Sequence, residues 1–212
     1  MRFLGTVRSI VAASLMLALN AGYGAAQTPA RPPKSKPAAP TTSVSGAAKV
    51  DAMLGAMFDN MHVITDMHYH KGEYNHIVNI SRMAVAANPD DLDMYADAGW
   101  LLWSMNRDAE AVALYEQGIK ANPNSYYMLD ELGQYYSIRK KDWPHAVQYL
   151  EQAAQKPDST EITLHMLAHA YEKNKQLDKA LATWARVLKH NDAGPARSNY
   201  DRIKKMMASQ RG

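Results

Sequence analysis

The stretch that decides the fold begins at residue 92 and reads LDMYADAGWLLWSMNRDAEAVALYEQGIKANP up to Pro123. It holds two runs in which apolar residues recur at spacings of three and four, as they do on one face of an α-helix. Pro123 lies 34 residues after Pro89, and Pro157 lies 34 residues further on. A proline at this interval ends one helix and turns the chain into the next, so the sequence predicts successive pairs of helices.

The same residue types recur within each predicted pair. A small residue in the first helix is followed by a small residue in the second helix and by a bulky residue four positions later. These sets are Gly99, Ala111 and Tyr115; Gly133, Ala146 and Leu150; and Ala168, Ala180 and Trp184. Small residues let two helices approach closely, while the bulky residue fills the space beside them. The second set is one residue longer, and we expect the extra residue in the loop at residues 142–144.

This arrangement closely resembles the tetratricopeptide-repeat (TPR) family, over residues 49–209. The resemblance implies an all-α fold: a right-handed TPR solenoid of about three clear repeats, with a degenerate N-terminal helix pair and a C-terminal capping helix. The expected units lie at about residues 51–89, 90–123, 124–157 and 158–191, with the cap at 196–209. In the first unit Thr65, Ile77 and Ser81 depart from the usual residue types, as is typical of a terminal repeat.

Residues 1–26 have the features of a bacterial-type secretory signal peptide. Arg2 and Arg8 precede an apolar stretch at residues 9–19, and small residues lead to a cleavage site before Gln27. The apolar stretch is too short to cross a bilayer core, which needs roughly 20 residues. We therefore expect a periplasmic or secreted protein without a membrane span after cleavage, with an uncleaved membrane anchor as the alternative. The chain has no cysteine, which excludes disulfides and a lipid-anchored start.

Residues 27–48 are rich in Pro, Ala, Ser and Lys, a composition that predicts a disordered linker. The formal net charge of +3 arises before residue 48, where there are basic residues and no Asp or Glu. These basic residues are Arg2, Arg8, Arg31, Lys34 and Lys36. The rest of the chain has a formal charge near −2. Binding to nucleic acid needs clustered Lys and Arg, so nucleic acid is excluded as a partner.

In the TPR family the first helix of each pair lines a concave groove, and the resemblance implies which residues face it here. They are Asp59, His62, Asp66, Tyr69, Trp100, Trp103, Tyr127, Asp130, Gln134, His165 and His169. This mixture suits a protein or peptide partner held by aromatic anchors, with polar groups fixing its register. For Trp100 and Trp103 the alternative is packing against neighbouring helices. The family's clamp for a terminal carboxylate is missing, because Ala96 and Trp100 occupy its first two places.

Histidines and methionines suggest metal binding as an alternative function. His165 and His169 lie four residues apart on a predicted helix, but they supply only two ligands, and groove polarity explains them better. A second set consists of His62, His68, His70, His76, Met53, Met57 and Met61. Its methionines repeat every four residues, the spacing of a buried stripe. We therefore predict no metal site and no other cofactor, and keep periplasmic handling of copper or zinc as the alternative.

The sequence contains no motif for nucleophilic catalysis, phosphate binding or dinucleotide binding. The acidic residues Asp90, Asp91, Asp93 and Asp97 are attributed to helix starts, where capping and the helix dipole favour them. We predict no catalytic residue and no enzymatic activity. The leading hypothesis is an exported scaffold that binds a protein or peptide in its groove. A self-associating structural module, and so a possible homo-oligomer, is a further alternative.

Overall fold

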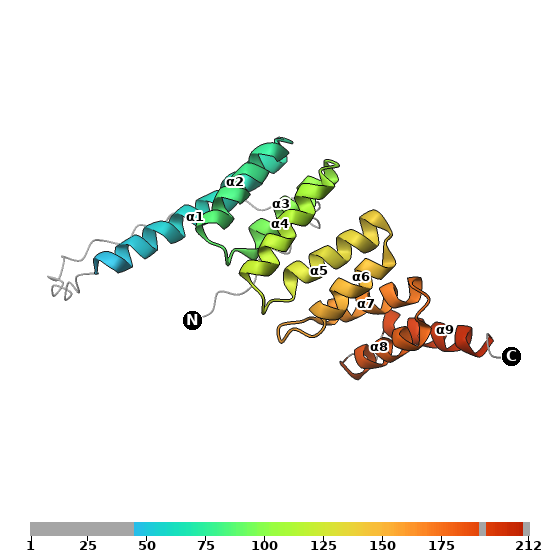
Figure 1. The fold of residues 1–212 in the computed structure, drawn as a ribbon. Coiled ribbons are helices and arrows are strands. Elements are labelled where there is room, and N and C mark those ends of the chain that lie inside the picture. The colour runs from blue at the N-terminus through green and yellow to red at the C-terminus, as the bar shows by residue number, and fades with distance from the viewer. Residues whose placement is uncertain (1–44, 191–193, 210–212) are drawn as a thin grey trace, which may run out of the picture. The chain divides into compact units, whose positions relative to one another are not determined.

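The computed structural model describes residues 45–190 and 194–209, and every regular element in these residues is a helix (Figure 1). The predicted signal peptide and most of the predicted linker lie outside the described residues. The first helix begins at Gly46, three residues before the expected start of the repeat domain. None of the described helices is both long and apolar enough to span a membrane.

The described helices follow one another in pairs, and each packs mainly against the next along the chain. They are α1 (Gly46–His70), α2 (Tyr74–Ala87), α3 (Leu92–Ser104), α4 (Asp108–Ala121), α5 (Tyr127–Gln134), the π-helix η1 (Tyr135–Lys140), α6 (Trp143–Ala153), α7 (Glu161–Lys173), α8 (Leu177–His190) and α9 (Pro195–Ser209). Contact between sequential neighbours is the defining feature of a solenoid. The predicted all-α solenoid, with its N-terminal helix pair and its C-terminal helix, is therefore confirmed.

A left-handed residue lies in the turn of each helix pair. Gly72, Asn106, Lys141 and Lys175 have φ angles of 72°, 64°, 56° and 60°, and they lie 34, 35 and 34 residues apart. A residue in this conformation commonly ends a helix and lets the chain reverse. Each pair therefore reverses through a turn that contains a left-handed residue.

The extra residue of the second repeat is absorbed in η1, and not in the loop at residues 142–144 where we expected it. In the pair before it, the backbone N–H of Arg107 donates to the carbonyl of Leu102, five residues earlier. The corresponding bond in the second repeat runs from Asp142 to Tyr136, six residues earlier. A π turn accommodates one more residue than an α turn, so the loop itself keeps its usual length.

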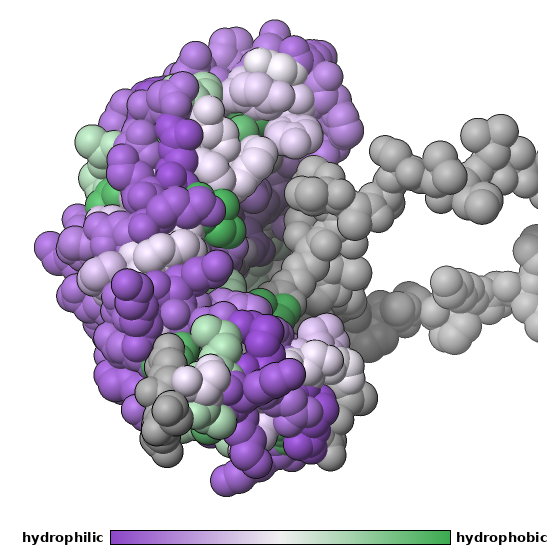
Figure 2. Space-filling view, turned by 90° about the vertical axis from the view of Figure 1, so that its right-hand side faces the viewer, coloured by the Kyte–Doolittle hydropathy of each residue, from purple (hydrophilic) through white to green (hydrophobic). Residues whose placement is uncertain are grey.

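The predicted contacts between small and bulky residues hold the pairs together. A Cβ atom added to Gly99 would lie 2.3 Å from Cε1 of Tyr115, and one added to Gly133 would lie 2.5 Å from Cγ of Leu150. Trp184 is fully buried against α7 and α9 in the third repeat. On the face drawn in Figure 2 hydrophobic residues form small separate groups, which agrees with an apolar interior between the helices.

The predicted burial of the methionine stripe in α1 is wrong for two of its three members. Met53 is 72% exposed and Met57 is 39% exposed, whereas Met61 packs partly against the core. The reason is length: α1 has 25 residues and its partner α2 has 14. The N-terminal part of α1 therefore extends beyond the helix that would cover it (Figure 1).

Candidate functional site

The surface formed by the first helices of the pairs, α1, α3, α5 and α7, carries the residues predicted to line a groove; we call it the first-helix face. On α3, Trp100 is 43% exposed, and its ring meets that of Trp103 edge to face at 5.9 Å between centroids. Trp103 is half-buried and packs against the core. Trp100 is thus available for contact, while Trp103 mainly supports it.

Carboxylates from α3 and α5 share one region of this face. Asp97 is exposed at the surface of α3, but neighbouring protein atoms crowd its carboxylate, and this partial loss of water, reinforced by the charges of Asp93 and Asp91, raises its pKa to about 6. Burial, followed by the charges of Asp130 and Asp97, raises the pKa of Glu131 to about 7. Because the charge of Asp97 on α3 raises the pKa of Glu131 on α5, the carboxylates of the two helices form a single region of negative potential.

The sequence predicted that the acidic residues lie at the starts of helices, and this is right for Asp91 and wrong for Asp97. Asp91 caps α3 by accepting a hydrogen bond from the backbone N–H of Met94. Asp97 lies in the middle of α3, one turn before Trp100. A signal for this was present in the sequence, since positions 93, 97 and 100 are spaced to share one face of a helix. Positions 127, 131 and 134 repeat that spacing on α5, which identifies Glu131.

Two predicted residues of α5 bond to each other. Asp130 is 5% exposed and accepts a hydrogen bond from Nε2 of Gln134 at 3.2 Å. Tyr127 is half-buried against the core. Its pKa is raised mainly by this burial and, to a smaller extent, by the negative charge of Glu131. Tyr127 and Gln134 therefore border the acidic region, while Asp130 lies beneath it.

Tyr115 reaches this region from the second helix of its pair. Its ring passes over Gly99, where an added Cβ would lie 2.8 Å from the hydroxyl oxygen. The hydroxyl is buried and has no hydrogen bond of ordinary geometry among the described residues. It lies close enough to Glu131 to oppose part of the rise in the pKa of that carboxyl. A buried hydroxyl without a full partner therefore lies beside the acidic region.

His62 connects α1 to the acidic region. Its Nε2 lies 3.1 Å from Oδ2 of Asp91, and this bond is the main reason that the pKa of His62 is raised. The charges of Asp91, Asp93 and Asp97 add to the rise, although partial burial opposes it. The acidic region therefore favours a positive charge on the imidazole of His62.

The other predicted residues of α1 do not join the acidic region. Asp59 is exposed, Asp66 lies 3.6 Å from Nε2 of His70, and Tyr69 packs against Tyr74 with ring centroids 5.8 Å apart. The contact of Asp66 lies at the C-terminal end of α1, and the contact of Tyr69 joins α1 to α2.

His165 and His169 of α7 have structural partners. Both rings lie edge-on against the buried ring of Trp184, with centroids 5.2 and 4.9 Å away. His165 also lies 3.3 Å from Glu161, and burial is the main reason that the pKa of His169 is lowered. Glu172, next to His169, is held through both oxygens by Arg202 of α9. These contacts explain the two histidines as parts of the third repeat.

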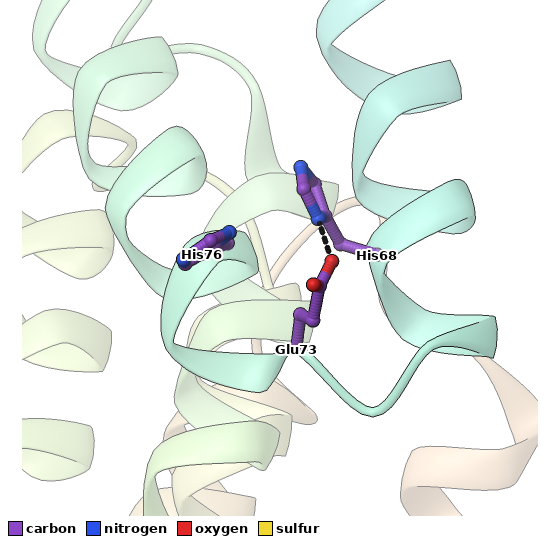
Figure 3. Close-up of side chains that lie close together, drawn as sticks. All are labelled: His68, Glu73 and His76. Carbon is purple, nitrogen blue, oxygen red and sulfur yellow. Dashed lines mark hydrogen bonds and ion pairs between the residues drawn. The ribbon is translucent and has the colours of Figure 1, made fainter.

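One group of three potential metal ligands is present in the described residues, and it lies at the turn between α1 and α2. It consists of His68, Glu73 and His76 (Figure 3). Nδ1 of His68 is 2.6 Å from Oε2 of Glu73, and the two imidazole centroids are 5.0 Å apart. Of the histidines singled out in the sequence, His62 and His70 are engaged elsewhere.

Two segments of the sequence match the profile of a known family. Residues 92–125 and residues 137–200 each match a family described as tetratricopeptide repeat. The first segment contains α3 and α4, and the second runs from within η1 to the first part of α9. No protein with curated function matches this sequence significantly.

Solved structures with a similar fold are also TPR proteins, at low sequence identity. One is PilF of Pseudomonas aeruginosa, with 14% identity, a TM-score of 0.59, and coverage of 74% of this chain and 71% of that one. YrrB, described as a TPR protein with an unusual peptide-binding site, has 16% identity, a TM-score of 0.53, and coverage of 68% and 74%. PilW, a type IV pilus biogenesis factor, has 16% identity, a TM-score of 0.55, and coverage of 73% and 71%. At these identities the likeness shows a shared fold.

Proposed function

This chain is a tetratricopeptide-repeat protein, and we propose that it is exported and binds a peptide segment of a partner on its first-helix face. The fold is typical of scaffolds for protein–protein interaction. It acts by binding and not by catalysis. Peptide binding by this fold has a precedent in YrrB, which is described as having a peptide-binding site.

The observation that carries the proposal is the exposed Trp100 beside the carboxylates of Asp97 and Glu131. Partial removal of water from these carboxylates, together with the negative charges around them, disfavours their charged forms, which is why their pKa values are raised to about 6 and about 7. A Lys or Arg side chain brought next to them restores the favourable ionised state. The same cation gains from contact with an indole face, by about 0.5–1 kcal/mol at an exposed site. The segment bound is therefore basic, with an apolar residue beside the cation.

Export is supported by the charged start, short apolar stretch and small residues of positions 1–26. The test is to express the full chain in a Gram-negative host, to separate the periplasm from the cytosol and membranes, and to sequence the N-terminus. We expect a soluble periplasmic product that begins at Gln27. A full-length product in the membrane fraction would support the uncleaved anchor instead, and a full-length cytosolic product would refute export.

The binding test compares a Lys/Arg-bearing apolar peptide with the same peptide after each basic residue is replaced by Glu. We expect fluorescence anisotropy to show binding of the basic peptide alone, weakened at least tenfold by Trp100→Ala and severalfold by Glu131→Gln. The matched control is Met83→Ala on α2, a second helix, where Met83 is 57% exposed. Equal binding of both peptides, or equal effects of Trp100→Ala and Met83→Ala, would refute the site.

A further inference from the structure

The turn between α1 and α2 places three ligand-type side chains around one point, and this arrangement is independent of the first-helix face. His68 comes from the last turn of α1, Glu73 immediately precedes α2, and His76 lies in the first turn of α2 (Figure 3). One ligand atom from each residue lies within 4.8 Å of the other two. We propose that these residues form a binding site for a single divalent transition-metal ion of the zinc type.

The donor set selects the class of ion. Two imidazole nitrogens and one carboxylate oxygen suit Zn²⁺, Cu²⁺ or Ni²⁺, whereas Mg²⁺ and Ca²⁺ require mainly oxygen ligands. Three protein ligands leave a fourth position for water, the arrangement found in open zinc sites. His68 and His76 bind through neutral imidazole, and Glu73 binds as the ionised carboxylate.

The side chains need only small movements to close around an ion. Zinc bonds to nitrogen and oxygen are about 2.0–2.2 Å long, which requires ligand atoms roughly 3.3–3.5 Å apart. The ligand atoms now lie within 4.8 Å of one another, so the longer separations must shorten, and the 2.6 Å contact between His68 and Glu73 must lengthen. Glu73 and His76 are exposed and can rotate, while His68 is partly buried and provides the fixed side of the site.

The backbone holds the three ligand residues in register. The N–H of Glu73 donates to the carbonyl of His68 at 3.0 Å, and the N–H of His76 donates to the carbonyl of Glu73 at 3.0 Å. Gly72, with φ of 72°, makes the reversal between them and donates to the carbonyl of Tyr69. Each ligand residue is therefore linked to the next by a main-chain hydrogen bond, so little backbone ordering is required when the ion binds.

The bound ion joins the end of α1 to the beginning of α2. This is the helix pair in which Thr65 and Ser81 replace the small and bulky residues of the other repeats. Because the ion binds the folded turn and not the unfolded chain, it stabilises this pair by mass action.

The test is titration of the chelator-treated full chain with Zn²⁺ by calorimetry. We expect one saturable site with a Kd below about 10 μM, weakened at least tenfold by His76→Asn and by Glu73→Gln. Both substitutions are at exposed positions, and circular dichroism checks that the variants fold. We also expect added Zn²⁺ to raise the Tm of the unmodified chain but not that of His76→Asn.

The matched control is His145→Asn, because Nδ1 of His145 lies 2.7 Å from Oδ2 of Asp142 in a turn that offers two such ligands instead of three. This variant should keep the zinc affinity of the unmodified chain. Absence of a saturable site below about 10 μM would overturn the proposal, and so would equal losses for His76→Asn and His145→Asn. Neither result depends on whether the first-helix face binds a peptide.

Discussion

The first helix pair, α1 and α2, and the second, α3 and α4, share a turn but differ in what fills the space between their helices. In the second pair Gly99 makes room for Tyr115, beside Ala111. In the first pair Ile77 takes the place of that alanine, and Ser81 takes the place of the tyrosine. Both replacements are nearly fully buried, at 3% and 1% exposure.

The bulky side chain has therefore moved by one helical turn while the helices still pack closely. The left-handed residue of the turn, Gly72 in the first pair and Asn106 in the second, is common to both. Packing thus tolerates an exchange of volume between neighbouring sites, provided that the turn and the total volume are kept. The pairs also differ in how far one helix covers the other. The helices α3 and α4 have 13 and 14 residues and match in length, whereas α1 extends well beyond α2.

The largest expected effect breaks the packing of a regular pair. Gly133→Leu places a Cβ 2.5 Å from Cγ of Leu150, so α5 and α6 must separate. We expect a loss of about 3 kcal/mol or more in the free energy of unfolding, measured by urea denaturation. The control is Gly55→Leu in the uncovered part of α1, where an added Cβ meets no atom within 4 Å.

For Gly55→Leu we expect a gain of about 0.5–1 kcal/mol, because leucine has a higher helix propensity than glycine. If Gly133→Leu cost no more than about 0.5 kcal/mol, the close approach of the helices in the regular pairs would be wrong.

The second prediction sharpens the comparison through the π turn. Deletion of Ile138, an exposed residue of η1, converts this π turn to an α turn. The repeat formed by α5, η1 and α6 then has the length of its neighbours. We expect a change of less than about 1 kcal/mol. Deletion of Ser104, exposed at the end of α3, has no extra residue to remove and should cost about 2 kcal/mol or more. Similar losses for the two deletions would contradict the role of η1.

The sequence alone predicts the repeats because their pattern is local: proline spacing and the sets of small and bulky residues suffice. It does not predict the exposure of Met53 and Met57, since that depends on where α2 ends and not on the spacing within α1. The extra residue was detectable from length, but its position was not, because a π turn and a longer loop have the same length.

The candidate site is predicted in part, and the reason is again spatial. The candidate residues Trp100 and Tyr127 follow from the family's pattern, and the stripe 93, 97 and 100 could have been found from helix periodicity. The raised pKa values of Asp97 and Glu131 arise between two helices, so no single stretch reveals them. The same holds for His68 and His76, which were among the histidines singled out but without their shared ligand Glu73.

The third prediction concerns two carboxylates whose pKa values are shifted in opposite directions, Glu131 on α5 and Glu73 before α2. The pKa of Glu131, raised to about 7, means that the folded protein keeps a proton that the unfolded chain releases between about pH 4.5 and 7. Its contribution to stability therefore falls as the pH rises through this window. At pH 8 we expect the free energy of unfolding of Glu131→Gln to exceed that of the unmodified chain by about 1–2 kcal/mol. At pH 4.5 the difference between the two proteins should be smaller.

Glu73 provides the contrasting case in the first pair. Its hydrogen bond with His68 lowers its pKa, so its contribution is present above its ordinary pKa and is lost as the pH falls. In zinc-free buffer, Glu73→Gln should therefore be slightly less stable than the unmodified chain at pH 7 and should match it in strong acid. Urea denaturation across pH checks both variants, and the same sign for both at neutral pH would contradict the opposite shifts.

The smallest expected effect tests whether the uncovered part of α1 contributes to the fold. Met53 and Met57 lie beyond the cover of α2, so the double variant Met53→Ser, Met57→Ser removes few contacts and should change the free energy of unfolding by less than about 0.5 kcal/mol. Met94 is 1% exposed between the first two pairs, and Met94→Ala should cost about 2–5 kcal/mol. A loss above about 1 kcal/mol for the double variant, growing with protein concentration, would show that a second copy covers α1 in solution, and light scattering would then report a dimer that the variant lacks. A loss of that size at every concentration would instead mean that a segment of the same chain covers these methionines, and the contrast between an uncovered first pair and the buried regular pairs would fail.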